Sequence, residues 1–112
     1  MNIFVELLSD RFELSTVDDE MICVDDNTVI FYSEQDELIT LLCPTFPLPD
    51  EQGKLVDLLV LNTQSDITFC AVEGLVLAKF VLNADDAFDD LCDRFSFYVG
   101  EIFSARDAFG YA

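Results

Sequence analysis

The chain has 112 residues, enough for one domain with its own core, and 52% of them are hydrophobic, which excludes the composition of a disordered chain. Acidic residues number 23 against five basic ones, and the net charge of −18 argues against nucleic acid and anionic membranes as partners, since both are bound through lysine and arginine. A basic peptide or domain would be attracted, although the same charge also fits the simpler role of keeping an apolar protein soluble.

The first half of the chain predicts a helix followed by a three-stranded antiparallel meander. Residues 3–12 carry apolar side chains at helical spacing, and polar turns at 25–27 and 34–36 separate three apolar runs. The strands expected from these runs are residues 21–24, 28–32 and 38–43. We expect the sheet to stop there, because the residues that follow include Pro44, Pro47 and Pro49, which cannot donate to a strand ladder.

The second half predicts another helix, a hairpin and a long last helix. Asp50 is placed to cap the middle helix, and Glu73-Gly74 joins two strands at 67–72 and 75–82. From Asn83 to Gly110 an apolar stripe recurs at helical spacing. The order α-β-β-β-α-β-β-α predicts a single α+β domain over residues 1–112, with an antiparallel sheet packed against helices.

The hairpin at 67–82 is apolar on both faces, which a hairpin with one face in water should not be. We therefore expect its second face to be buried against a helix, a ligand peptide or another subunit, and we predict a homodimer. The residues expected at the dimer interface lie on the middle helix and the hairpin: Leu55, Leu58, Leu59, Phe69 and Ala71. Lys79 is the exception in this run, and either a solvated lysine or an ion pair between subunits explains it.

The residue types that catalysis and metal binding use most are missing or badly placed. There is no histidine, and the four glycines form no phosphate-binding loop. Cys23, Cys43, Cys70 and Cys92 form no CxxC pair and are interpreted as buried free thiols. Acidic residues at 85, 89 and 93 lack the EF-hand pattern and are interpreted as a solvated helix face. We expect no catalytic residue, no metal site and no cofactor, so an enzyme is not the expected class.

One passage has a specific resemblance. The stretch Leu42-Cys43-Pro44-Thr45-Phe46-Pro47-Leu48-Pro49-Asp50, running into Leu55 and ending in Leu59-Val60-Leu61-Asn62, resembles the strand-to-second-helix passage of the class I, or Tir-chaperone-like, chaperones of bacterial type III secretion. Within that family it is similar to the branch that serves inositol-phosphatase effectors, as is Asp25-Asp26-Asn27 before an aromatic strand. The resemblance covers residues 20–62 in sequence and the rest in element order, and the chain departs from it at Gly53 and Gly100.

The resemblance implies a cytoplasmic bacterial homodimer that binds the N-terminal segment of an effector in extended form, without ATP, and keeps it stable and competent for secretion. It also implies delivery to the secretion apparatus, with the secretion ATPase as a further partner. Two other classes stay open: an acidic inhibitor or immunity protein that covers a basic site on a toxin or nuclease, and a dimeric adaptor with no role in export. A neighbouring gene for a large effector, or for a small basic toxin, would separate the first two.

The effector-binding groove is predicted from the apolar residues of the meander, because two helices cannot cover both faces of that sheet. We place the groove near the first helix. Its predicted residues are Phe4, Leu8, Phe12, Met21, Val29, Phe31 and Leu41. For any one of them, a place in the core is an equally good interpretation.

Overall fold

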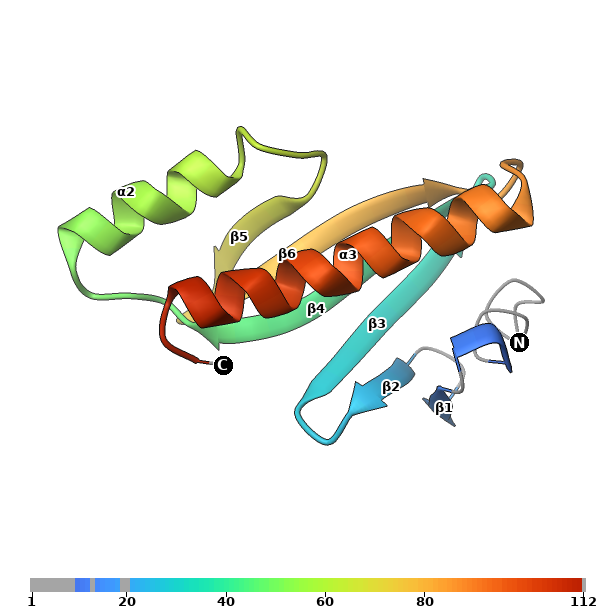
Figure 1. Ribbon diagram of the computed structural model, residues 1–112, viewed down its shortest axis with the longest axis horizontal. Coiled ribbons are helices and arrows are strands. Elements are labelled where there is room, and N and C mark those ends of the chain that lie inside the picture. The colour runs from blue at the N-terminus through green and yellow to red at the C-terminus, as the bar shows by residue number, and fades with distance from the viewer. Residues whose placement is uncertain (1–9, 13, 19–20, 112) are drawn as a thin grey trace.

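The computed structural model describes residues 10–12, 14–18 and 21–111 (Figure 1). Its elements are β1 (Ser15–Asp18), β2 (Met21–Asp25), β3 (Thr28–Gln35), β4 (Leu38–Pro47), α2 (Gln52–Leu61), β5 (Thr68–Val72), β6 (Leu75–Asn83) and α3 (Phe88–Ala108). Of the predicted first helix, residues 10–12 are helical, and residues 3–9 lie outside the described part of the chain. The predicted α+β class, the meander, the hairpin and both later helices are confirmed.

All the strands join one antiparallel sheet, in the order β1-β2-β3-β4-β6-β5. Strand β1 was not predicted, because residues 15–20 interrupt the apolar pattern; it is the edge strand next to β2. The long α3 runs along one face of the sheet, and α2 lies at one end beside β5 (Figure 1). We call the face under α3 the inner face and the opposite one the outer face.

The predicted end of the sheet at Cys43 is wrong, because β4 continues to Pro47. Pairing with β3 is last recorded at Leu42, so the rest of β4 has β6 as its only described neighbour, and proline is tolerated on such an edge. A bulge between Pro44 and Phe46 absorbs the irregularity and turns Phe46 into the core.

Two helix starts also differ from the sequence-based expectation. Glu51, not Asp50, precedes α2 in the capping position, and it makes no side-chain capping bond. Asn83 ends β6 instead of opening α3, and its Oδ1 accepts a hydrogen bond from the Asp85 N–H at 2.9 Å. The turn before β4 also lies later in the chain than predicted. It is formed by Asp36 and Glu37, both at positive φ, and β3 therefore continues to Gln35.

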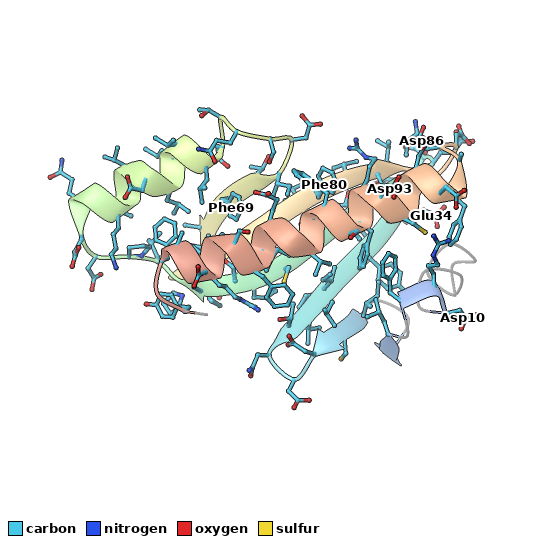
Figure 2. The ribbon with its side chains drawn as sticks, in the orientation of Figure 1. Asp10, Glu34, Phe69, Phe80, Asp86 and Asp93 are labelled. Atoms are coloured by element: carbon cyan, nitrogen blue, oxygen red, sulfur yellow. The ribbon has the colours of Figure 1, made fainter. Side chains whose placement is uncertain are left out.

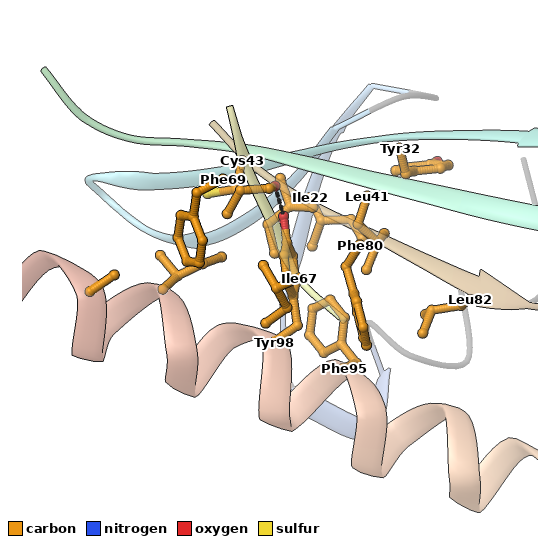
Figure 3. Close-up of a cluster of buried hydrophobic side chains, with 14 of the residues drawn as sticks. Ile22, Tyr32, Leu41, Cys43, Ile67, Phe69, Phe80, Leu82, Phe95 and Tyr98 are labelled. Carbon is orange, nitrogen blue, oxygen red and sulfur yellow. Dashed lines mark hydrogen bonds between the residues drawn. The ribbon is translucent and has the colours of Figure 1, made fainter. Parts of the chain in front are cut away.

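The core lies between the inner face and α3. Along β6 the side chains of Val76, Ala78, Phe80 and Leu82 are buried while their neighbours are not, which is the alternation of a sheet covered on one side. Figure 3 shows Tyr98 of α3 reaching into this cluster, where its hydroxyl donates to the Ala78 carbonyl at 2.5 Å. The helix is therefore fixed to the sheet by a directional bond as well as by apolar packing.

A buried arginine makes a second attachment near the end of α3. Arg106 has no carboxylate partner among the described residues and donates instead to neutral oxygens. Its acceptors are Thr28 Oγ1 at 2.5 Å and the backbone carbonyls of Asn27, Pro44 and Thr45 at 3.1–3.2 Å. One side chain thus joins α3 to the β2–β3 turn and to the bulge of β4.

Replacing Arg106 by leucine should lower the free energy of unfolding by roughly 2–3 kcal/mol, because it removes a charged donor and leaves buried oxygens unpaired. Urea unfolding measures this change. Lys54→Leu is the matched control, since Lys54 is an exposed cation, and it should stay within about 0.5 kcal/mol. Equal stability of the two variants would show that the Arg106 hydrogen bonds contribute nothing.

Candidate functional site

The outer face of the sheet is apolar although no described element covers it. Strands β2 to β4 place Met21, Val29, Phe31 and Leu42 there, and the hairpin adds Leu77. Phe31 remains 41% exposed. An antiparallel sheet with one face in water normally alternates apolar and polar residues, so this face has the composition of a binding surface.

Charge is distributed unevenly between the outer face and the rest of the molecule. The chain has 23 acidic residues, yet strands β2 to β6 place none of them on the outer face. Glu34 points to the inner side, and the bulge in β2 turns Asp25 toward Arg106. Lys79 is the one charged residue that these strands direct outward. This face can therefore be buried without desolvating a carboxylate.

The residues predicted for the effector groove do not form one surface. Met21, Val29 and Phe31 share the outer face, whereas Phe12 lies on the inner side, with its ring 5.6 Å from that of Phe95. Leu41 is completely buried beneath α3 and is a core residue, so it is corrected from the groove assignment. Phe4 and Leu8 lie outside the described residues.

A second apolar surface lies on the inner side, between Phe12 and Leu14, β2 and α3. Its cavity has a volume of about 300 Å³ and is lined by Phe12, Leu14, Val24, Phe95, Ser96 and Val99. Of this set, only Phe12 is among the residues predicted for the groove, because the apolar stripe of α3 predicts a core surface. Phe95 is buried as predicted, whereas Val24 and Val99 are only partly buried against the core.

The predicted dimer-interface residues also divide into two groups. Leu58 and Phe69 are buried within the protomer, so they are corrected to core residues. Leu59 is 67% exposed, and Val56 and Val60 on the same helix are exposed as well. Leu55 is half-buried and Ala71 is exposed. The unpartnered apolar surface of this region is thus centred on α2.

Asn62, at the end of α2, closes part of the β5 edge. Its Oδ1 accepts the Phe69 N–H at 2.6 Å, and its Nδ2 donates to the Phe69 carbonyl at 3.1 Å. These are the two bonds that a neighbouring strand would make. The sequence contains a signal for this role, since Asn62 is polar on the apolar face of its helix.

The titratable groups offer little chemistry. Burial raises the pKa of the Cys43 thiol to about 11, and burial also raises the pKa of the Tyr98 hydroxyl. A hydrogen bond with the Asp85 carboxyl raises the pKa of Glu37, but that carboxyl is exposed to water. The described residues contain no group of three or more metal-ligating side chains, and none of their helices is long and apolar enough to cross a membrane.

Comparison with known proteins identifies the class. Residues 4–110 match the type III secretion chaperone domain, so the chain belongs to this family, as the resemblance in its sequence predicted. The chaperone protein IpgE of Shigella flexneri is 28% identical over 98 residues, covering 86% of this chain and 82% of the relative. The chaperone protein SigE of Salmonella typhi is 32% identical over 72 residues, covering 63% of this chain and 64% of the relative.

The fold is also found among solved structures. A chain in the structure of the HopA1-SchA chaperone–effector complex superimposes with a TM-score of 0.66, at 16% sequence identity, over 94% of each chain. The family is one of chaperones, which is not an enzyme class.

The raised pKa of Cys43 predicts a loss of stability at alkaline pH. Between pH 9.0 and about 11 this thiol ionises in the unfolded chain but not in the folded one, so the free energy of unfolding should fall as pH rises, by roughly 3 kcal/mol in total. Below pH 9 the thiol should contribute no slope. Urea titrations from pH 7 to pH 11 measure the curve.

Cys43→Ala is the control for this curve. It should flatten the fall above pH 9 but leave most of the part that comes from Tyr98, whose pKa is raised chiefly by its own burial and further by the charge of the nearby Cys43 thiolate. The slope and not the absolute stability is compared, because the substitution also leaves a small cavity. Parallel curves for the two proteins would show that Cys43 is not the group responsible.

Proposed function

We propose that this chaperone binds the N-terminal segment of a type III secretion effector in extended form and keeps it stable and competent for secretion. The observation that carries the proposal is the outer face: apolar, uncovered by any described element and free of carboxylates. Membership of the type III secretion chaperone family supports the same role.

An extended segment suits a pleated surface. Its alternate side chains point the same way and can contact the outer face near Phe31 and Leu42, while the side chains between them remain in water. Burial of apolar side chains in this way needs no nucleotide. Because the contacts are made to an extended segment, they keep that segment unfolded. The cavity beside Phe12 and Phe95 provides a second site for an apolar side chain on the opposite side of the sheet.

We further propose a homodimer that works in the bacterial cytoplasm as a single domain over residues 1–112. Exposed Leu59, Val56 and Val60 on α2 support a dimer, because apolar side chains gathered on one helix are typical of an interface core. The negative charge supports a soluble location, since it disfavours contact with anionic membranes. Transfer of the effector to the secretion ATPase is part of the same proposal.

The effector is proposed to be an inositol phosphatase. The support for this is the passage from Leu42 to Asp50 and its continuation through α2, which resembles the branch of the family that serves such effectors. A pull-down from the native cytoplasm, followed by identification of the bound protein, tests this choice of effector.

The binding surface is tested by truncating one exposed phenylalanine. Phe31→Ala should leave the melting temperature nearly unchanged, because this side chain lies on the outer face, and should weaken binding of the effector's N-terminal segment by more than about 1 kcal/mol. Titration calorimetry with the segment of the effector encoded in the same locus measures the affinity. Phe12→Ala tests the inner cavity in the same way.

Leu41→Ala is the matched control, because Leu41 lies one strand away from Phe31 but points into the core. It should cost about 2–5 kcal/mol of stability, and the fraction that remains folded should bind with unchanged affinity. If Phe31→Ala unfolds the protein, or binds as tightly as the wild type, the outer face is not the docking surface.

The dimer is tested on α2. Leu59→Glu should convert a dimer into a monomer of 12.6 kDa in sedimentation at micromolar concentration, because it places a charge in an apolar contact. Gln52→Glu adds the same charge at the start of the same helix and should leave the dimer intact. A wild-type protein that sediments as a monomer would contradict the proposal directly.

A further inference from the structure

Strand β5 covers only half of the edge of β6. It pairs with β6 from Leu75 to Lys79, where Thr68 is its first residue, and it leaves Phe80–Asn83 with β4 as the only described neighbour. Figure 1 shows this half of β6 extending past β5 toward the start of α3. The sheet therefore has a step in its edge, four residues long, in a strand that is otherwise paired on both sides.

The backbone groups at this step can be assigned a direction. The Ala84 N–H donates to the Glu37 carbonyl at 2.8 Å, on the β4 side. Because residues of an antiparallel strand alternate in the side to which they direct both backbone groups, Leu82 and Phe80 also face β4. Val81 and Asn83 then face the open edge. The Asn83 carbonyl accepts from the Asp86 N–H, so the groups without a partner among the described residues are the Val81 N–H and carbonyl and the Asn83 N–H.

The edge of β5 is closed, unlike the edge of β6 at Val81. On that edge the corresponding groups, at Phe69, are both occupied by the side-chain amide of Asn62. No described side chain makes such a cap at Val81, which remains 39% exposed. One edge position is closed by the chain itself, while the other is left available for pairing.

The step gathers two cations and one carboxylate on a strongly acidic chain. A cavity of about 420 Å³ is lined there by Asp66, Thr68, Lys79, Phe80, Val81 and Arg94. Two of the chain's five basic residues are in this set, and neither makes an ion pair with a described carboxylate. Arg94 instead lies over the Phe80 ring, 4.8 Å from its centroid, and the Phe97 ring is tilted against Phe80 at 6.5 Å between centroids. Figure 2 labels Phe80 at this position beside α3.

We infer that the open edge of β6 at Val81 and Asn83 receives an extended segment of the effector as an added strand, and that this segment carries a carboxylate for Lys79 or Arg94. This inference rests on the proposed function. It specifies which part of the chaperone binds the segment and which chemical groups of the segment are recognised. Backbone pairing supplies the attachment, and the two cations select an acidic segment against the repulsion of the rest of the protein.

The two cations lie on opposite sides of the sheet, which defines the pattern of the segment. Lys79 is directed to the outer face, and Arg94 reaches the edge from α3 on the inner face. Successive side chains of an added strand point to opposite faces. Acidic residues at neighbouring positions would therefore meet both cations, and an apolar residue pointing inward would meet Phe97, which is exposed.

The experiment measures amide hydrogen exchange of the full chain by NMR, with and without the N-terminal segment of the effector encoded in the same locus. The Val81 and Asn83 amides should become protected on binding, while the Leu82 amide, directed to β4, should be protected in both states. Lys79→Glu and Arg94→Glu should each weaken binding by about 10-fold, or about 1.4 kcal/mol. Lys54→Glu makes the same change in net charge on α2 and should alter affinity less than about 2-fold.

A second probe keeps the inference separate from the identity of the effector. A capped synthetic peptide of alternating threonine and valine with two adjacent glutamates should protect the Val81 amide, and the same peptide with two glutamines should protect it less. If the effector segment does not bind the chain at all, the proposed function fails, and the peptide pair still decides the edge. If the segment binds through Phe31 but leaves Val81 and Asn83 unprotected, the proposed function stands and this inference is overturned.

Protection of Val81 in the free protein that rises with protein concentration would assign the edge to a second copy of the chain and would also overturn the inference. If Lys79→Glu and Lys54→Glu lower the affinity equally, the charge at the edge has no local role, and the inference is overturned as well.

Discussion

The position of α3 against the sheet determines which surfaces of this protein are free. Tyr98 and Arg106 hold the helix by hydrogen bonds to backbone carbonyls of β6 and β4, so its place along the sheet is set by directional contacts in addition to apolar packing. Since α3 and the inner face bury one another, no helix in the described part of the chain covers the outer face. Among the described elements, one long helix thus lies against one face of a six-stranded sheet and leaves apolar side chains exposed on the other.

The distribution of charge follows the same division. A protein with a net charge of −18 resists close contact with another acidic surface, and burial of a carboxylate would add a desolvation penalty. On the outer face, where strands β2 to β6 place no carboxylate, neither cost arises. The acidic residues lie instead in turns and on the solvent side of α3, where Asp89 and Asp93 are exposed. The charges that keep the protein in solution are therefore compatible with an exposed apolar face of the sheet.

Much of the fold could be predicted from the sequence, because alternation along strands and the stripe of α3 are local patterns. The errors came where a distant contact decides the outcome. Pro44 predicts the end of the sheet, but the local pattern does not reveal that β4 is no longer paired with β3 at that point. The groove assignment mixed Leu41 with Phe31 because neighbouring strands show the same apolar content, and only their register shows which side chain faces α3. Asn62 differs from the apolar residues on its helix face, but its partner Phe69 is found only in the structure. Arg94 lies over the Phe80 ring, which is distant in sequence, and no local pattern indicates this contact.

The capping of β5 by Asn62 depends on the two different ends of one amide group. Oxygen accepts from the Phe69 N–H, and nitrogen donates to the Phe69 carbonyl. Deamidation to aspartate would keep the shape of the side chain but replace the donor by a second acceptor, so the Phe69 carbonyl would face a negatively charged oxygen. The cap would then repel one of the groups that it now satisfies, and an edge that is closed to other strands would become open to them. Ageing of a single side chain would in this way convert a protected sheet edge into a site for uncontrolled self-association.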